Sequence, residues 1–410
     1  MAASLPHLLC PLPSLGLQHR IVMAPLTRLR GEVDTLSAGP KVVEYYAQRA
    51  SKGGLLVTEG CPISPETPYE TAPGIFTKEQ EAGWKRVVEA VHRKECKISL
   101  QLWHLGRMSH EAFASHPYLK AQNRPLGSVS SSSVTPPGHS RNWKGEKLPY
   151  TCPRPLNTDE LLTRVPHDYR LAAEAAKRCG FDFVEIHGAH GYLLDQFFCD
   201  GVNKRSDEFG PQSAENRTRL LGKVLKEVID VYGADRVGIR ISPTYLDTFA
   251  YKGCTDSNPE KTYRDVLTFL DSFHLGYLML SEPRWNGGRD NADPLTDPTY
   301  SIPIRHKWAR EVYHGPIIGS SSFTPATAEK AIADGIYDAI AFGRFFISNP
   351  DLVERVRIGA PLNKYDVTTF YTKDTVGYTD YPDLEGKIGA GNRKEQIRVE
   401  DIGKGRRSKL

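Results

Sequence analysis

The sequence has no apolar run of about 18 residues, so it offers no transmembrane helix. Its apolar N-terminal segment, residues 1–17, has no basic start and is interrupted by prolines. We therefore expect this segment to lead into a first strand rather than to act as a secretory signal. A strong excess of one charge is also missing, because 53 Lys and Arg against 49 Asp and Glu give a net charge of +4. Such a balance argues against nucleic acid as a partner.

The cysteine spacing of a zinc ribbon is also absent. The seven cysteines are an odd number without a C-x-x-C motif, which fits a reducing compartment and argues against a zinc ribbon. No G-x-G-x-x-G motif follows the first apolar run, which disfavours a dinucleotide-binding doubly wound sheet. The 39% of hydrophobic residues are spread along the chain and suffice for a large core.

Short apolar runs alternate with helical patterns along most of the chain. This alternation indicates a parallel sheet, and eight such units favour a closed barrel over an open sheet. The predicted strands are 21–25, 55–59, 98–102, 183–187, 237–241, 277–281, 317–319 and 339–342. The predicted helices are 41–50, 78–92, 158–177, 214–232, 260–273, 304–313 and 324–334.

Polar residues on one face of several strands also favour the barrel. In the run 237–242, Gly238, Arg240 and Ser242 alternate with apolar side chains, and Glu185 and His187 alternate in the same way in the run 183–187. Helices cover both faces of a doubly wound sheet, which would favour apolar residues on both. One polar face instead fits a barrel whose inner end is a site. We therefore predict an α/β protein with a single (β/α)₈ TIM barrel.

Two segments do not fit a simple barrel. Residues 104–157, after the third strand, are rich in Ser, Pro and Gly and too long for a simple loop, so we expect a capping insertion over the barrel mouth. The predicted barrel domain is 1–385, and 386–410 is expected to be a flexible tail. The tail ends in Ser408, Lys409 and Leu410, a peroxisomal targeting signal. We thus expect a peroxisomal location and the peroxisomal import receptor as a partner.

The carboxyl ends of barrel strands face the active site, so their residues are the candidates for function. They combine an amide, three arginines, an imidazole and small residues, without a carboxylate cluster for a divalent cation. Read from the chain, they are Pro25, Leu26, Thr27, Gly60, Gln101, His187, Arg240, Arg284, Ser320, Ser321, Ser322, Gly343 and Arg344. Ends of the seventh and eighth strands usually bind phosphate. This set predicts a phosphorylated ligand with a polar, planar part.

The segment His187–Tyr192, HGAHGY, follows the fourth strand. His187 and His190 can donate two hydrogen bonds to one oxygen, and the phenol of Tyr192 is a weak acid suited to protonating a carbanion-like carbon. Such a set would polarise a carbonyl group and protonate the neighbouring carbon. Metal ligation or a structural role for the histidines stays open, although we expect no metal because the other strand ends lack carboxylates.

Six motifs resemble the Old Yellow Enzyme family of FMN-dependent ene-reductases. They are APLTR (24–28), LQLWHLGR (100–107), HGAHGYLLDQF (187–197), RSDEFG (205–210), AFGRFFISNPDLV (341–353) and PLNKYDVTTFY (361–371). The resemblance covers about residues 8–385, and HGAH with the peroxisomal ending is most similar to plant-type 12-oxophytodienoate reductases. It implies an FMN-binding (β/α)₈ barrel.

The resemblance also implies roles for individual residues. Pro25, Leu26, Thr27, Gly60, Gln101 and Arg240 would contact the flavin ring, and Ser320, Ser321, Ser322, Gly343 and Arg344 would hold its phosphate. His187 and His190 would bind the substrate carbonyl, Tyr192 would be the proton donor, and Trp103, Phe76, Tyr371 and Arg284 would contact substrate. The family usually has Ser-Gly-Gly in the phosphate loop. Serine can replace these glycines only where no positive φ is required.

The implied activity is NADPH-dependent reduction of the C=C bond of α,β-unsaturated ketones. NADPH would reduce bound FMN, the flavin N5 would give hydride to the β-carbon, and Tyr192 would protonate the α-carbon. The expected substrates are 12-oxophytodienoate-like cyclopentenones or another oxylipin, and a homodimer is possible. Two alternatives stay open: a general small-enone reductase of the same family, and a non-catalytic barrel that binds flavin or oxylipin. A phosphate-binding lyase or isomerase is disfavoured, because no Schiff-base lysine or paired carboxylates lie at the strand ends.

Overall fold

The structure is a computed structural model that describes residues 5–66, 68–124, 126–243, 253–284, 294–386, 396–398 and 401–402. Eight parallel strands form a closed ring in the order β2-β1-β13-β12-β11-β10-β9-β4, and the pairing of β4 with β2 closes it. The strands are β1 (Ile21–Met23), β2 (Leu55–Val57), β4 (Lys97–Trp103), β9 (Phe183–His187), β10 (Val237–Ile241), β11 (Tyr277–Ser281), β12 (Ile317–Ser320) and β13 (Ala339–Phe342). All eight predicted strands, and the barrel, are confirmed.

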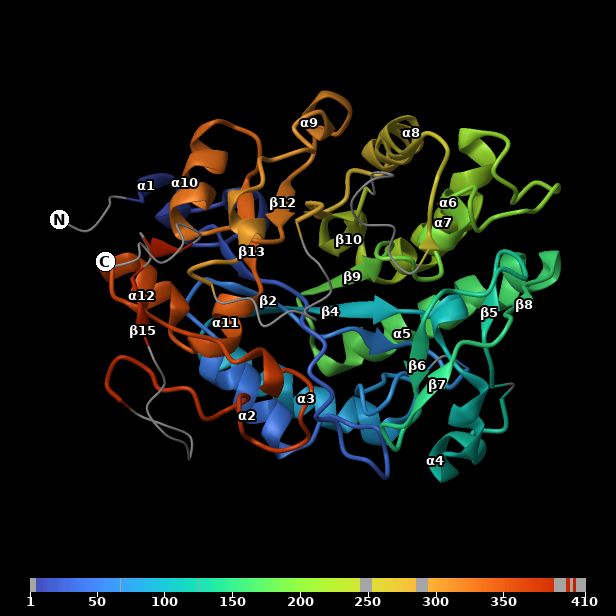
Figure 1. Cartoon of the computed structure of the whole chain (residues 1–410), viewed down its shortest axis with the longest axis horizontal. Coiled ribbons are helices and arrows are strands. Elements are labelled where there is room, and N and C mark those ends of the chain that lie inside the picture. Colours follow the sequence, from blue (N-terminus) through green and yellow to red (C-terminus); the bar gives the residue numbers. More distant parts are fainter. Residues whose placement is uncertain are drawn as a thin grey trace, which may run out of the picture.

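Helices surround the barrel (Figure 1). They are α1 (Pro6–Leu9), α2 (Pro40–Arg49), α3 (Lys78–His92), α5 (Val165–Cys179), α6 (Asp195–Phe198), α7 (Ala214–Tyr232), α8 (Pro259–Asp271), α9 (Ala309–Val312), α10 (Pro325–Ala333), α11 (Arg344–Ser348) and α12 (Leu352–Ile358). Thr77 begins α3 as an N-cap, accepting a hydrogen bond from the backbone N–H of Gln80. Within the described residues, no helix is long and apolar enough to cross a membrane.

Two predicted helices differ from the structure. The helix expected at 304–313 is only α9; Arg305 and His306 lie in irregular backbone before it, and their N–H groups donate to the carboxylate of Glu282 (2.8 and 3.2 Å). The helix expected at 158–177 begins with a π-helical turn, η4 (Glu160–Arg164), before α5 starts. Pro166 lacks an N–H group, so the regular i to i−4 pattern cannot run through this point.

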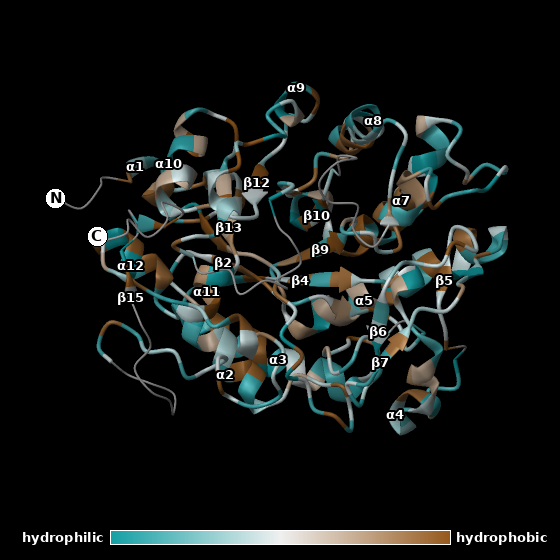
Figure 2. Ribbon diagram, in the orientation of Figure 1, coloured by the Kyte–Doolittle hydropathy of each residue, from teal (hydrophilic) through white to brown (hydrophobic). Residues whose placement is uncertain are grey.

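The interior of the barrel divides into an apolar and a polar half. The apolar residues form one cluster, to which the N-terminal segment contributes Leu12, Leu15 and Leu17. The strands contribute Val22, Leu55, Val57, Phe183, Tyr277, Met279, Ile318, Ala339 and Ala341. Ile239 and Ile241 of β10 belong instead to the larger cluster between the sheet and the helices. Gly238 and Arg240, with the opposite parity, therefore face the interior, as the alternation predicts. Figure 2 shows apolar strands at the centre and hydrophilic outer helix surfaces.

The long insertion after β4 lies on the side toward which that strand points (Figure 1). It contains η2 (Gly106–Met108), η3 (Glu111–Ser115), α4 (Pro117–Lys120), β5 (Val129–Ser130) paired with β8 (Arg154–Pro155), and β6 (His139–Arg141) paired with β7 (Lys147–Pro149). Its residue Tyr150 packs in one cluster with Trp103 at the end of β4. The insertion therefore reaches the site, and its action as a cap stays a prediction.

The tail prediction needs a partial correction. Gln396–Ile397 forms β15, which pairs antiparallel with β14 (Leu362–Asn363). Ile397 and Ile402 are buried against the core, with 4% and 7% of their surface exposed, so their burial fixes this part of the predicted flexible tail. The targeting residues Ser408, Lys409 and Leu410 lie outside the described residues.

Candidate active site

The end of β9 carries His187, and the tight turn after it carries His190 and Tyr192 of the predicted site. His190 has a φ of +57°, and the Gly191 N–H donates to the carboxylate of Asp195 (2.7 Å). The backbone N–H of His190 donates to the hydroxyl of Ser242 at the end of β10 (2.7 Å). Asp195 and Ser242 thus hold the turn, and with it His190 and Tyr192, against the barrel.

The histidine pair is neutral in the folded protein. Burial and the nearby charge of Arg240 lower the pKa of both His187 and His190 well below the usual value. The backbone N–H of Ala189 donates to Nδ1 of His187 (3.3 Å), so the single proton of the neutral ring lies on Nε2. His187 therefore offers a neutral N–H donor from this atom.

His190 makes a contact that the sequence did not indicate. Its Nε2 lies 3.1 Å from the hydroxyl of Ser281 at the end of β11, and Ser281 lies 3.0 Å from the hydroxyl of Ser321. The rings of His187 and His190 are 5.4 Å apart and nearly perpendicular. For both histidines to donate to one substrate oxygen, His190 would have to donate from Nδ1, or its Nε2 would have to leave the Ser281 hydroxyl.

Tyr192 lies in an aromatic group around Trp103. Its ring centroid is 4.9 Å from both His187 and Trp103, edge to face in each case. Tyr69 packs on Trp103 at 5.5 Å, and Tyr150 completes the cluster. Burial first, and the neighbouring tyrosines next, raise the pKa of Tyr192 well above its usual value, so the phenol keeps its proton. Among the described residues, no hydrogen bond is made by the Tyr192 hydroxyl.

Gln101 and Arg240 share the polar half of the barrel interior with a third residue, Glu185. The amide Nε2 of Gln101 donates to Oε1 of Glu185 (2.7 Å), and Glu185 is fully buried. Burial raises the pKa of Glu185 to about 7, while the positive charge of Arg240 opposes that rise. The carboxylate and Arg240 therefore lie close enough to interact electrostatically.

The ends of β1, β2 and β13 bring further predicted residues to the same end of the barrel. A Cβ atom on Gly60 would lie 2.7 Å from the Trp103 ring and 3.3 Å from Oε1 of Gln101, so a side chain there would fill the space beside them. A Cβ on Gly343 would lie 3.2 Å from Leu26. Pro25 is buried, and Leu26 and Thr27 are partly buried. The missing side chains of Gly60 and Gly343 thus allow Trp103, Gln101 and Leu26 to approach the backbone at the strand ends closely.

The predicted phosphate loop is strained. Ser321 and Ser322 have φ values of +82° and +51°, which disfavour residues with a Cβ atom. The loop therefore does require positive φ, the condition under which serine is a poor substitute for glycine. Hydroxyl contacts offset part of the cost: Ser322 donates to the Arg284 carbonyl (3.0 Å) and lies 2.9 Å from the Thr299 hydroxyl.

Other predicted phosphate contacts have protein partners. The Ser320 hydroxyl donates to the Leu280 carbonyl (3.2 Å), so its side chain serves the strand rather than a ligand. The guanidinium of Arg344 forms an ion pair with Asp297 (2.6 Å) and lies over the ring of Tyr365. Asp297 fixes the position of Arg344 at the start of α11.

Three predicted substrate contacts have different outcomes. Phe76 lines a surface cavity of about 350 Å³ between α3 and α5, whereas Tyr69 is the ring beside Trp103, so a contact of Phe76 with substrate stays a prediction. Arg284 is buried, stacks on Phe323 at 4.1 Å and donates to the Ile302 carbonyl, so its contact with substrate stays a prediction. Tyr371 is 49% exposed, and its charge affects the pKa of Tyr192, which fits a position at the rim.

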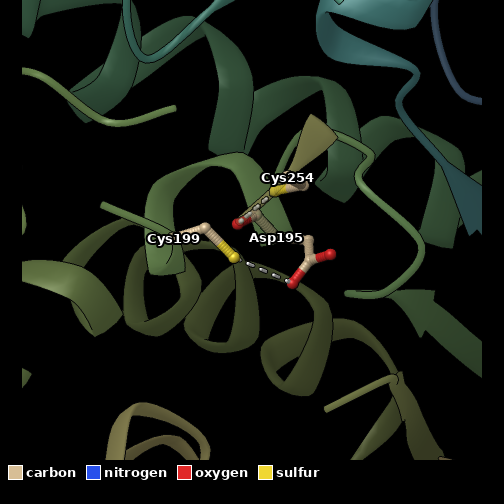
Figure 3. A group of neighbouring side chains, drawn as sticks. All are labelled: Asp195, Cys199 and Cys254. Carbon is tan, nitrogen blue, oxygen red and sulfur yellow. Dashed lines mark hydrogen bonds between the residues drawn. The ribbon is translucent and has the colours of Figure 1, made fainter. Parts of the chain in front are cut away.

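A buried group of Asp195, Cys199 and Cys254 could be mistaken for a metal site (Figure 3). The hydroxyl of Tyr263 donates to Oδ1 of Asp195 (2.6 Å), and Oδ2 accepts from the backbone of Gly191. The neighbouring thiol of Cys254 and burial raise the pKa of Cys199 well above its usual value, which opposes the thiolate that a metal needs. The group therefore supports the His190–Tyr192 turn.

Comparison with known proteins identifies the family. Residues 12–363 match the NADH:flavin oxidoreductase / NADH oxidase family. The chain belongs to this family. It is 41% identical over 387 residues to 12-oxophytodienoate reductase 7 of Oryza sativa subsp. japonica, covering 91% of this chain and 93% of the relative. 12-Oxophytodienoate reductase 1 of the same organism is 41% identical over 393 residues, covering 94% of each chain.

Solved structures agree with this assignment. Morphinone reductase superimposes with a TM-score of 0.79 at 41% identity, covering 93% of this chain and 97% of that one. An old yellow enzyme homologue from Zymomonas mobilis gives a TM-score of 0.78 at 36% identity, covering 89% and 96%. A further structure, 40% identical with a TM-score of 0.79 and covering 94% and 99%, is morphinone reductase in complex with tetrahydroNAD. The protein is thus an FMN-dependent oxidoreductase of the Old Yellow Enzyme type.

The residues of this chain fit FMN. The buried Nε1 of Trp103 has no hydrogen-bond partner among the described residues. Gln101 and Arg240 offer an amide and a guanidinium for the polar edge of a flat ring, and Arg344 with the 320–322 loop offers charge and N–H groups for a phosphate. The Ser281–Ser321 contact joins the 320–322 loop to His190.

Sequence reasoning missed Glu185, Tyr69, Tyr150 and Ser281. Glu185 had a usable signal, because it alternates with apolar residues on the same strand face as His187, and Arg240 required an anionic partner. Ser281 likewise ends a predicted strand. Tyr69 and Tyr150 lie in irregular segments whose course no periodicity reveals.

The strained serine loop yields a stability prediction. Replacing Ser321 by Gly should leave the protein about 1 kcal/mol more stable than replacing it by Ala, because both variants lose the hydroxyl and only Ala keeps the Cβ at positive φ. The same comparison applies to Ser322. Urea unfolding of the four variants measures the difference, and equal stability of the Gly and Ala variants would contradict the strain.

Proposed function

We propose that the protein is an NADPH-dependent ene-reductase that reduces the C=C bond of α,β-unsaturated ketones, with 12-oxophytodienoate-like cyclopentenones as its substrates. The observation that carries this proposal is the arrangement of a neutral His187 with its proton on Nε2 beside the un-ionised phenol of Tyr192, 4.9 Å between ring centroids. Relatives named 12-oxophytodienoate reductases at 41% identity support the substrate class.

The residues divide the work of such a reaction. FMN, when bound, supplies the hydride for the β-carbon of the enone. The Nε2–H of His187 donates a hydrogen bond to the ketone oxygen and so stabilises the charge that gathers there. The Tyr192 hydroxyl gives its proton to the α-carbon. Trp103, Tyr69 and Tyr150 surround the phenol with apolar surface and exclude water.

Two alternatives remain as outcomes of experiment. A general small-enone reductase is favoured by the equal identity, 41%, to a structure named morphinone reductase. A non-catalytic barrel that binds flavin or oxylipin is favoured by the strain at Ser321 and Ser322. Both alternatives predict a yellow, FMN-containing protein, but only the general reductase would reduce an enone.

Anaerobic half-reactions test the proposal. The holoenzyme is bleached with NADPH or NADH and then mixed in parallel with 12-oxophytodienoic acid and cyclohexenone, while FMN absorbance is followed. We expect faster bleaching by NADPH and a higher kcat/KM for 12-oxophytodienoic acid. A preference for cyclohexenone would favour the general reductase, and no reoxidation by either enone would favour the non-catalytic barrel.

Tyr192→Phe tests the proton donor. We expect reoxidation by the enone to slow at least about 100-fold, since positioned proton donors contribute factors of this size, while bleaching by NADPH keeps its rate. Tyr150→Phe, a tyrosine of the same cluster, is the matched control and should change reoxidation little. Reoxidation of Tyr192→Phe at the parental rate would remove the proton-donor role.

The location of the protein is proposed to be the peroxisome, from Ser408, Lys409 and Leu410 at the end of the chain. An N-terminal fluorescent fusion of the full chain should enter peroxisomes, and the same fusion ending at Arg407 should stay in the cytosol because the import receptor has lost its signal. Microscopy with a peroxisomal marker measures this. Peroxisomal import of the shortened chain would refute the role of the signal.

A further inference from the structure

Glu185 is a buried carboxylate in the interior of the barrel, in the layer of side chains next to the candidate flavin site. It lies opposite Gln101 of β4 and Gly238 of β10 in the strand register. Because Gly238 has no side chain, the ring of Tyr277 occupies that space: a Cβ on Gly238 would lie 2.3 Å from it. The Tyr277 hydroxyl continues to Ser99 of β4 (3.0 Å). Residues of β4, β10 and β11 thus surround Glu185.

The contact with Glu185 decides which end of the Gln101 amide faces the site. Burial raises the pKa of Glu185 to about 7, so above this pH the group is an ionised carboxylate that only accepts hydrogen bonds, and the NH₂ group of Gln101 donates to it (2.7 Å). The carbonyl Oε1 is then directed toward Gly60, where a Cβ would lie 3.3 Å from it. Gln101 therefore presents an acceptor for an N–H group of a bound ring.

Glu185 also balances the charge of Arg240. Both side chains face the interior from neighbouring strands, and the electrostatic effect of Arg240 reaches Glu185, His187 and His190 alike. A buried positive charge near a cofactor stabilises any negative charge that the cofactor gains. A carboxylate beside it weakens this effect.

We infer that Glu185 is a positioning residue of the cofactor site, which fixes the amide of Gln101 and, by partly neutralising Arg240, lowers the redox potential of the bound flavin. This inference rests on the proposed function. The reduced flavin carries more negative charge than the oxidised one, so a site with an unopposed arginine favours the reduced form, and Glu185 restrains that preference.

Glu185→Gln tests the inference, because it keeps the shape and removes the charge. We expect the full-length holoenzyme to bind reduced FMN at least tenfold more tightly relative to oxidised FMN than the parent does, which is about +30 mV for a two-electron couple. Equilibration of bound FMN with a reference dye during slow reduction measures the potential, at a pH well above the Glu185 pKa of about 7 so that the parent carries the charge. An unchanged or lower potential would overturn the inference.

Glu282→Gln is the matched control. Glu282 is equally buried, and its carboxylate accepts from Arg305, His306 and Tyr337. The potential of FMN bound to Glu282→Gln should match that of the parent. An equal rise in potential in Glu282→Gln and Glu185→Gln would also overturn the inference, since the effect would then not depend on Arg240 and Gln101.

Glu185→Asp provides a second test if Glu185→Gln does not fold. It keeps the charge but is one methylene shorter, so it should lose the Gln101 contact and raise the FMN dissociation constant several-fold while the potential stays at the parental value. A parental dissociation constant, or a shifted potential, would contradict the inference. A parent protein that binds no FMN would instead refute the proposed function, so the two failures are distinguishable.

Discussion

The parallel hydrogen bonding that closes β4 onto β2 is the constraint on which the site depends. In a closed parallel ring every strand ends on the same side, so side chains far apart in the sequence meet there. Gln101 and Glu185, 84 residues apart, form a 2.7 Å hydrogen bond, and Ser281 links His190 to Ser321. The same alternation of side chains fills the opposite half of the interior with apolar residues, so the polar groups gather at one end.

Burial then sets the chemistry of those polar groups. It keeps both histidines neutral and the Tyr192 phenol protonated, which makes the site a set of neutral donors rather than of charges. Arg240 adds the positive charge, and Glu185 opposes it. An environment of this kind suits the polarisation of a ketone and the delivery of one proton, while the redox chemistry belongs to the flavin.

Much of the fold and of the site could be predicted, for identifiable reasons. The eight strands were found because their apolar runs alternate with helical patterns, and Arg240 was placed in the interior because Ile239 and Ile241 flank it. The position of Phe76 beside the cavity between α3 and α5 could not be predicted, because its segment is irregular and no periodicity shows its course. The helix expected at 304–313 begins only at Ala309, and the preceding backbone at Arg305 and His306 instead donates to Glu282, a contact between distant segments that periodicity does not show.

The amino-acid sequence by itself determined the barrel, the inward parity of its polar residues and the residue types at the strand ends, because these depend on local periodicity and on motifs within single segments. Only the tertiary structure decided that Glu185 orients Gln101, that Asp195 holds the histidine turn and that Ser321 and Ser322 adopt positive φ. Those features depend on strand register and loop closure, which bring separate segments within hydrogen-bonding distance and which no single segment encodes.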